Sequence, residues 1–129
     1  VFAFPSVREF GGGVVLEAMA LGLAPVVLDY GGPAELVPDG CGVVVPIGCR
    51  KEIVTAFRNV LERLCADPAA AHAMGLRAQD HVRGNFTWDA KAAQLVAVYE
   101  RVLQARPAAE GIFADLRTQG RWTVPECRA

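Results

Sequence analysis

The hydrophobic pattern of the chain changes about half-way along its 129 residues. In the first half, short unbroken apolar runs are separated by segments rich in glycine and proline, which is typical of strands covered on both faces of a parallel sheet. In the second half, apolar residues recur every three or four positions, which indicates helices. The pattern therefore predicts an α/β protein with three layers, in which a short parallel sheet of about three strands is followed by a C-terminal helical segment.

The unbroken apolar runs predict three strands, at residues 1–4, 26–28 and 43–45. A helix is predicted between the first two strands, at residues 14–21, and Gly22 would end it. One helical turn is expected at residues 34–37, and Asp39-Gly40 indicates a turn before the last strand. Strand, helix and strand at this spacing predict right-handed βαβ units.

Three longer helices are predicted in the second half. The first begins near residue 50, and its apolar stripe comprises Ile53, Val54, Phe57, Val60, Leu61 and Leu64. The second begins at Asp67-Pro68, with the aspartate as N-cap and the proline at the first helical position. Thr87 would cap the third helix, and Pro107 would end it.

Length and composition fit one ordinary domain. Residues 1–106 are expected to form it, and residues 107–129, which show no clear pattern, are expected to be a tail without a predicted element. The chain is 53% hydrophobic, its formal net charge is −1, and it carries no basic stripe. Nucleic acid and an anionic membrane surface are therefore not predicted as its main partners.

The four cysteines give no sign of a metal site or a disulfide framework. None belongs to a Cys-x-x-Cys motif, and His72 and His81 lie far from them in the sequence. We therefore expect no metal and no cofactor. Reduced thiols in a cytoplasmic protein are the simplest interpretation of Cys41, Cys49, Cys65 and Cys127.

The segment between the first strand and the first helix carries the candidate chemistry. It contains Gly11, Gly12 and Gly13, which allow the backbone to approach a ligand closely. The helix start behind them offers unbonded N–H groups and a partial positive charge, and an open α/β sheet binds ligands at this end of its strands. A diphosphate would fit there, but a tight strand-to-helix turn without a ligand explains the glycines at least as simply.

Two glutamates flank this turn. Glu17 is the charged residue of a helix that is otherwise apolar all round, so it is expected to be buried. A buried carboxylate must be paired or face a polar cavity, because the helix dipole contributes only about 0.3–1 kcal/mol against the cost of burial. Glu9 lies on the other side of the glycines. Carboxylates accept hydrogen bonds from hydroxyl groups, so two of them beside an anion site indicate a ligand that contains sugar.

The order of motifs further along the chain is more specific. Glu9-x₇-Glu17 continues as Glu-Ala-Met-Ala-x-Gly and is followed by Gly31-Gly32-x-x-Glu35. This order resembles the family-4 retaining glycosyltransferases of the two-lobed GT-B type, and the resemblance covers roughly residues 1–105. It implies that residues 1–106 are a partial Rossmann-like lobe, the C-terminal, donor-binding lobe of an enzyme that moves a sugar from a nucleoside diphosphate sugar to an acceptor hydroxyl with retention.

The resemblance also implies roles for individual residues. Glu9 would be the catalytic residue and would bind hydroxyls of the donor sugar near the reacting centre, while Glu17 would bind the ribose of the nucleotide. Backbone N–H groups would hold the sugar or the diphosphate along the run Phe10, Gly11, Gly12, Gly13 and Val14. The family usually needs no metal, because basic side chains and the helix dipole offset the charge of the diphosphate.

One departure from the family pattern bears on this site. The family commonly has an aromatic residue two places after the first glutamate, whereas here Phe10 follows Glu9 directly. The identity of the N–H donors is therefore left open. Arg8 is interpreted as a solvated loop residue and Glu35 as a structural one. Asp29 either faces the site or caps the glycine turn that follows it.

The resemblance further implies what surrounds the chain in a whole enzyme. The partners would be a nucleotide sugar and the N-terminal lobe of the same protein, and upstream segments would supply an arginine and a lysine to the diphosphate. The strand at residues 1–4 would pair with an upstream strand; left unpaired, its edge would be an aggregation hazard or an oligomer interface. The chain alone is expected to be inactive.

Several alternatives stay open at this point. The parent protein is expected in the cytoplasm, with peripheral association at the inner face of the membrane as one option. The lobe could be a non-catalytic module that binds nucleotide or scaffolds a partner. Another GT-B protein, such as a nucleotide-sugar epimerase or a sugar phosphorylase, is the nearest alternative enzyme.

Overall fold

The computed structural model describes residues 1–104. Its elements follow one another as β1 (Phe2–Phe4), α1 (Gly13–Ala20), β2 (Pro25–Leu28), α2 (Gly31–Glu35), β3 (Val43–Val45), α3 (Arg50–Ala66), α4 (Pro68–Asn85) and α5 (Trp88–Gln104). The chain divides into two compact units, Val1–Ala90 and Lys91–Ala129. The predicted tail at residues 107–129 lies outside the described residues.

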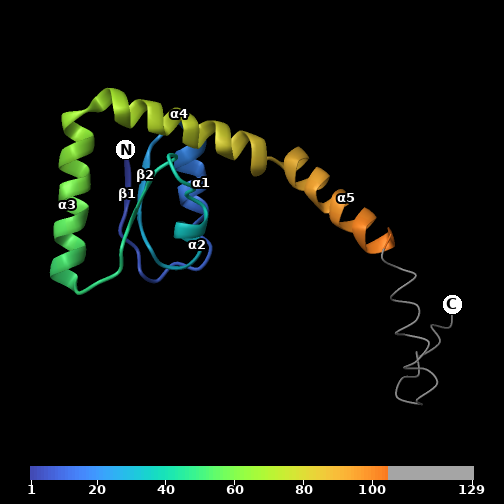
Figure 1. Ribbon diagram of the computed structural model, residues 1–129, viewed down its shortest axis with the longest axis horizontal. Coiled ribbons are helices and arrows are strands. Elements are labelled where there is room, and N and C mark those ends of the chain that lie inside the picture. Colours follow the sequence, from blue (N-terminus) through green and yellow to red (C-terminus); the bar gives the residue numbers. More distant parts are fainter. Residues whose placement is uncertain (105–129) are drawn as a thin grey trace, which may run out of the picture. The chain divides into compact units, whose positions relative to one another are not determined.

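The strands form a three-stranded parallel sheet in the order β1-β2-β3 (Figure 1). Phe4 is the register partner of Val27, and Leu28 is that of Val45. β2 lies in the middle and is buried along its whole length. The predicted short parallel sheet is therefore confirmed. Because the strands are parallel, the loops that follow β1 and β2 leave the sheet at the same edge.

Helices cover both faces of the sheet, with α1 and α3 on opposite sides of the strands (Figure 1). Val27 packs into a core with Val15 of α1 on one face. Val26 and Leu28 pack with Phe57 of α3 on the other face. The side chains of β2 alternate between the two cores because successive residues of a strand point to opposite faces. The predicted three layers are thus present.

Helix α4 packs against both α1 and α3. Its buried Gly75 faces the turn that follows α1, and a side chain there would overlap the carbonyl oxygen of Gly22. The approach of the two backbones therefore requires a residue without a side chain at position 75. Gly22 itself has a φ of 76°, which suits the turn that ends α1, as predicted.

Capping signals from the sequence are confirmed at two helices. The Asp67 carboxylate accepts a hydrogen bond of 2.9 Å from the Ala70 N–H at the start of α4. The Thr87 hydroxyl accepts one of 3.2 Å from the Ala90 N–H at the start of α5. The prediction of a single turn at residues 34–37 was wrong in position, since α2 already begins at Gly31.

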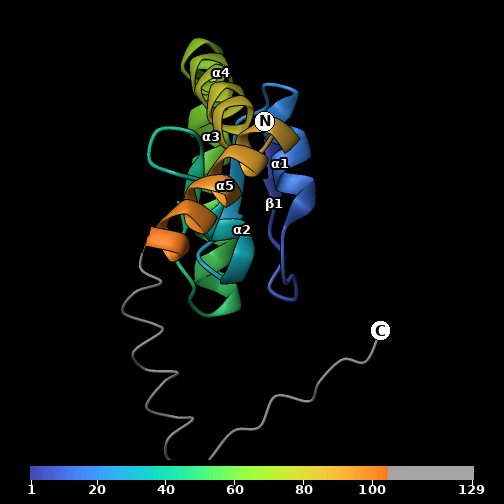
Figure 2. The same cartoon turned by 90° about the vertical axis from the view of Figure 1, so that its right-hand side faces the viewer.

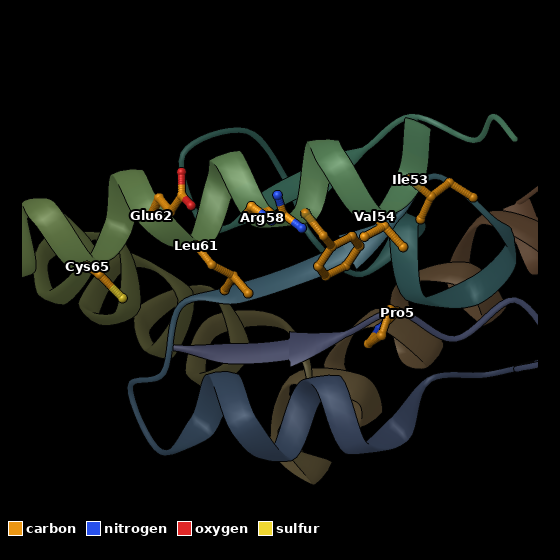
Figure 3. Close-up of a pocket in the computed structure, with 8 residues that line it drawn as sticks. Pro5, Ile53, Val54, Arg58, Leu61, Glu62 and Cys65 are labelled. Atoms are coloured by element: carbon orange, nitrogen blue, oxygen red, sulfur yellow. The ribbon is translucent and has the colours of Figure 1, made fainter. Parts of the chain in front are cut away.

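One face of β1 is less covered than its apolar run predicts. Ala3 is exposed, and within residues 1–104 β1 pairs with a strand on one side only. A hollow of about 510 Å³ lies beside this strand, where side chains of α3 point toward β1 (Figure 3). It is mostly apolar and is lined by Pro5, Ile53, Val54, Phe57, Arg58, Leu61, Glu62 and Cys65. We name it the β1 groove.

In the second unit, the described residues belong to α5. Its large apolar residues are exposed at Leu95, Val96, Tyr99, Val102 and Leu103. Trp88, the first residue of α5 and part of the first unit, is 91% exposed. Among residues 1–104, no helix is long and apolar enough to cross a membrane.

We predict that Gly75→Ala destabilises the first unit by about 1–3 kcal/mol, because the new methyl group forces α4 away from the Gly22 carbonyl. Urea unfolding followed by circular dichroism measures this effect. Gly84→Ala is the matched control, since nothing lies within 4 Å of a side chain added there. That variant should be unchanged or more stable, by up to about 1 kcal/mol. Equal stability of the Gly75→Ala variant and the wild type would contradict the packing argument.

We also predict a pH-dependent effect at the start of α3. The carboxylate of Glu52 accepts a 2.7 Å hydrogen bond from the Cys49 backbone N–H, which, with a smaller contribution from the Cys49 side chain, lowers the pKa of Glu52 below its ordinary 4.5. A lowered folded-state pKa stabilises the fold above the ordinary pKa, and this contribution is lost as the pH falls through the lowered value. Glu52→Gln should therefore be less stable than the wild type at pH 7, and thermal unfolding should show this gap closing as the pH falls through the lowered pKa of Glu52. A gap that keeps the same size as the pH falls would refute this account.

Candidate functional site

Gly12 shapes the turn between β1 and α1. It is the N-cap of α1, with a φ of 63°, and its carbonyl oxygen accepts a 2.8 Å hydrogen bond from the Val15 N–H. A side chain at this position would come within 2.9 Å of the Pro33 ring. Both the positive φ and this close contact favour glycine here. The turn therefore depends on a segment that lies some twenty residues further along.

That segment is the first turn of α2, Gly31-Gly32-Pro33. Its backbone lies against the backbone of the loop between β1 and α1. A side chain at Gly32 would overlap the carbonyl oxygen of Phe10. Gly31 has a φ of 59°, and a side chain there would lie 3.3 Å from the carbonyl oxygen of Glu9. In both views α2 and the loop after β1 lie at the same end of the sheet (Figures 1 and 2). The two loops are thus held together at the carboxyl edge of the sheet.

The N–H groups predicted as ligand donors are not all free. The Gly12 N–H donates a 3.3 Å hydrogen bond to Oε1 of Glu9, so it is already used inside the loop. Gly13 and Val14 begin α1, and within residues 1–104 their N–H groups donate to no other group of the chain. The first turn of α1 therefore offers two unbonded donors and the positive end of a helix dipole.

Glu9 is half-buried beside this turn. Its Oε2 forms no hydrogen bond within the described residues, so one carboxylate oxygen remains available to a ligand. Glu9 lines a hollow of about 570 Å³ between the two loops. The other lining residues are Phe10, Gly11, Tyr30, Gly31, Gly32, Glu35 and Leu36. We name this hollow the edge pocket.

The expectation that Glu17 is buried was wrong. α1 buries Val15, Ala18 and Met19, whereas Glu17 is exposed on the opposite face together with Val14 and Leu21. Glu17 is also the fifth residue of α1, beyond the first turn in which a carboxylate gains from the helix dipole. Glu17 does not line the edge pocket. The structure thus separates the two glutamates that the sequence pairs.

Two weaker candidates stay at the margin of the site. Asp29 is exposed at the end of β2, and no side chain caps α2, so the capping interpretation of Asp29 is wrong. In the loop after β1, the Ser6 hydroxyl accepts a 3.4 Å hydrogen bond from the Arg8 N–H. Arg8 is exposed and does not line the edge pocket.

Sequence reasoning missed two residues of the edge pocket. Tyr30, half-exposed, was given no role, and Glu35 was interpreted as structural although it is exposed and shares the pocket with Glu9. A signal for both was present, because loops that follow adjacent parallel strands meet at one edge. The Gly31-Gly32 pair after the second strand indicates a second loop at that edge, as Gly11, Gly12 and Gly13 indicate the first.

Metal ligands do not gather in the described part of the chain. No three histidine, cysteine, aspartate or glutamate residues there are placed to hold an ion. Cys41, Cys49 and Cys65 are free thiols, the first of them buried. Cys127 lies outside the described residues. The absence of a resident metal stays a prediction.

The chain is similar to several glycosyltransferases in sequence. It is 38% identical over 104 residues to a lipopolysaccharide core biosynthesis mannosyltransferase from Rhizobium leguminosarum bv. viciae, a match that covers 80% of this chain and 28% of that protein. It is 35% identical to an alpha-maltose-1-phosphate synthase from Mycolicibacterium smegmatis, over 79% of this chain and 27% of that protein. The chain therefore spans about a quarter of the length of these relatives.

A solved structure agrees with these matches. Sucrose-phosphate synthase from Thermosynechococcus elongatus superimposes with a TM-score of 0.62 and 33% sequence identity, over 80% of this chain and 25% of that one. Residues 1–63, which contain both glycine segments, match the family described as glycosyl transferases group 1. The parallel sheet, the glycine turn at its carboxyl edge and these similarities together show that the chain belongs to the group 1 glycosyl transferases and has part of a GT-B fold.

Proposed function

We propose that the protein that contains this chain transfers a sugar from a nucleoside diphosphate sugar to an acceptor hydroxyl, with retention of configuration at the sugar. In this proposal the chain supplies part of the donor site. The observation that carries it is the turn from β1 to α1, where two unbonded N–H groups lie between a half-buried Glu9 and an exposed Glu17. Retention rests on the family resemblance alone.

The start of α1 is suited to bind the diphosphate of the donor, which gains negative charge during the reaction. When the bond between the sugar and the diphosphate breaks, the bonding electrons leave with the diphosphate. The N–H groups of Gly13 and Val14 and the positive end of the helix dipole would stabilise that charge, since they are already oriented before the reaction begins. Preorganised donors of this kind cost no rearrangement at the moment of reaction.

The two glutamates would position hydroxyl groups on either side of the diphosphate. Oε2 of Glu9 is available in the edge pocket and would accept a hydrogen bond from the donor sugar near the reacting carbon. Glu17 is exposed on the outer face of α1 and would bind the ribose. No metal is required in this proposal.

The rest of the donor lobe would come from the same protein. The unpaired side of β1 and the apolar β1 groove beside it suit an additional strand and the side chains that cover it. The relatives, about three times as long as this chain, have room for these segments and for an acceptor lobe. Pairing of the same edge in an oligomer is the alternative. The reduced thiols agree with a cytoplasmic protein.

We predict that Glu9→Gln in the intact protein lowers kcat for sugar transfer by about 10- to 100-fold, because a hydrogen bond to an ionised group is worth about 1.5–3 kcal/mol. Glu17→Gln should raise KM for the donor by about tenfold, with kcat within a few-fold of wild type. Release of nucleoside diphosphate in the presence of acceptor measures both effects.

Asp80→Asn makes the same change of carboxylate to amide at an exposed position of α4 and should leave both constants unchanged. Wild-type kinetics in the Glu9→Gln variant would overturn the role of Glu9. Binding of nucleoside diphosphate by an intact wild-type protein that shows no transfer to any acceptor would favour the non-catalytic lobe.

We also predict that the 129-residue chain alone catalyses no transfer, because the proposed site needs further donor contacts and an acceptor lobe. Incubation with radiolabelled donor and sugar acceptors tests this. Product above the level of a heat-denatured sample would contradict the division of the site between this chain and the rest of the protein.

A further inference from the structure

Pro33 is the buried residue of α2, and its ring lies against the glycine turn between β1 and α1. A side chain added at Gly12 would begin 2.9 Å from Cγ of Pro33 and 3.1 Å from its backbone nitrogen and Cα. Side chains added at Gly11 or Gly13 would meet no other part of the described chain within 4 Å. Gly12 is therefore the glycine of the turn that Pro33 packs against.

Gly12 connects the groups that the proposed function assigns to the donor. It is the N-cap of α1, so its conformation, with a φ of 63°, sets where the N–H groups of Gly13 and Val14 begin the helix. Its own N–H donates the 3.3 Å hydrogen bond to Oε1 of Glu9. A displacement of Gly12 would therefore move both the helix start and the Glu9 carboxylate.

The glycines alone do not keep the turn in this conformation. A residue without Cβ adopts positive and negative φ about equally readily, and three such residues in succession give the backbone considerable freedom. The ring of Pro33 can limit that freedom, because it closes onto its own backbone and cannot rotate away. Proline is tolerated at this position, in the first turn of α2, since an N–H there needs no partner within the helix.

We propose that Pro33 is a positioning residue of the donor site. Its ring holds Gly12, and Gly12 holds the N–H groups of Gly13 and Val14 where the diphosphate binds. This inference rests on the function proposed above and extends it to a buried residue that touches no part of the donor. Groups that bind or stabilise a reacting centre must be held to within about 0.5 Å of their productive geometry. A small shift of Gly12 therefore weakens the site even when the fold survives.

The test compares two buried prolines in the intact protein that contains this chain. Pro33→Ala removes the part of the ring that faces Gly12. Pro25→Ala makes the same change at the start of β2, where the ring lies 2.6 Å from the position at which a side chain added at Gly42 would begin. Both prolines are fully buried and both pack on a glycine, but Pro25 lies at the other end of its strand from the donor site. Both variants should lower the melting temperature, because each leaves a space in the packing.

Binding and transfer are then measured well below the melting temperatures. Calorimetry identifies which of the nucleoside diphosphates of uracil, guanine, adenine, cytosine and thymine the wild type binds, and gives its Kd for each variant. Pro33→Ala should raise this Kd about tenfold and lower kcat for transfer about tenfold, because the N–H donors and Glu9 are both displaced. Pro25→Ala should keep both constants within about twofold of the wild type.

Three results would overturn the proposal. Wild-type Kd and kcat in Pro33→Ala would mean that the ring does not position the donor site. Equal losses in the two variants would mean that any gap in the packing weakens the site. A Pro33→Ala protein that does not fold would mean that Pro33 serves the fold as a whole. A wild-type protein that binds none of the five diphosphates would instead remove the proposed function itself.

Discussion

The carbonyl oxygen of Phe10 lies where a side chain at position 32 would begin, so the loop after β1 and the start of α2 meet backbone to backbone. The parallel register makes this contact feasible, because it brings the ends of β1 and β2 to one edge of the sheet. Glu9 and Tyr30 stand next to the contacting residues, so backbone packing rather than side-chain packing sets their positions. Glycine loses more conformational entropy on folding than other residues do. It is nevertheless favoured here, because only a residue without a side chain lets the two backbones come this close.

Local signals in the sequence predicted much of the fold. β3 was predicted at its observed bounds because Pro46 and the preceding glycine limit the apolar run on both sides. Asp67 was recognised as a cap because its carboxylate acts within one turn. Gly31 and Gly32 were assigned to a loop, yet they begin α2, since Pro33 in a first turn needs no N–H partner. Each of these features depends on residues that are close in the sequence, so it can be predicted from the sequence alone.

Features that depend on distant parts of the molecule were harder to predict. The apolar composition of α1 implied burial on all sides, but composition does not specify which faces another element covers, and Glu17 lies on an uncovered face. The run of β1 likewise predicted cover on both faces, whereas Ala3 is exposed beside the β1 groove. The place of Glu35 in the edge pocket was missed, because it depends on the contact between the second loop and the first. Such properties belong to the assembled fold.

The separation of charges within the site links these observations. The edge pocket contains two carboxylates, whereas the positive end of α1 lies just beyond it at Gly13 and Val14. A neutral, hydroxylated group and an anionic group of one donor would thus find different environments a few residues apart. The partial charge of about +0.5 at a helix start does not neutralise a diphosphate, so the proposed site requires cationic side chains from beyond the described residues. In the proposed function, segments that pack beside β1 would complete the donor site, and the β1 groove and the greater length of the relatives leave room for them.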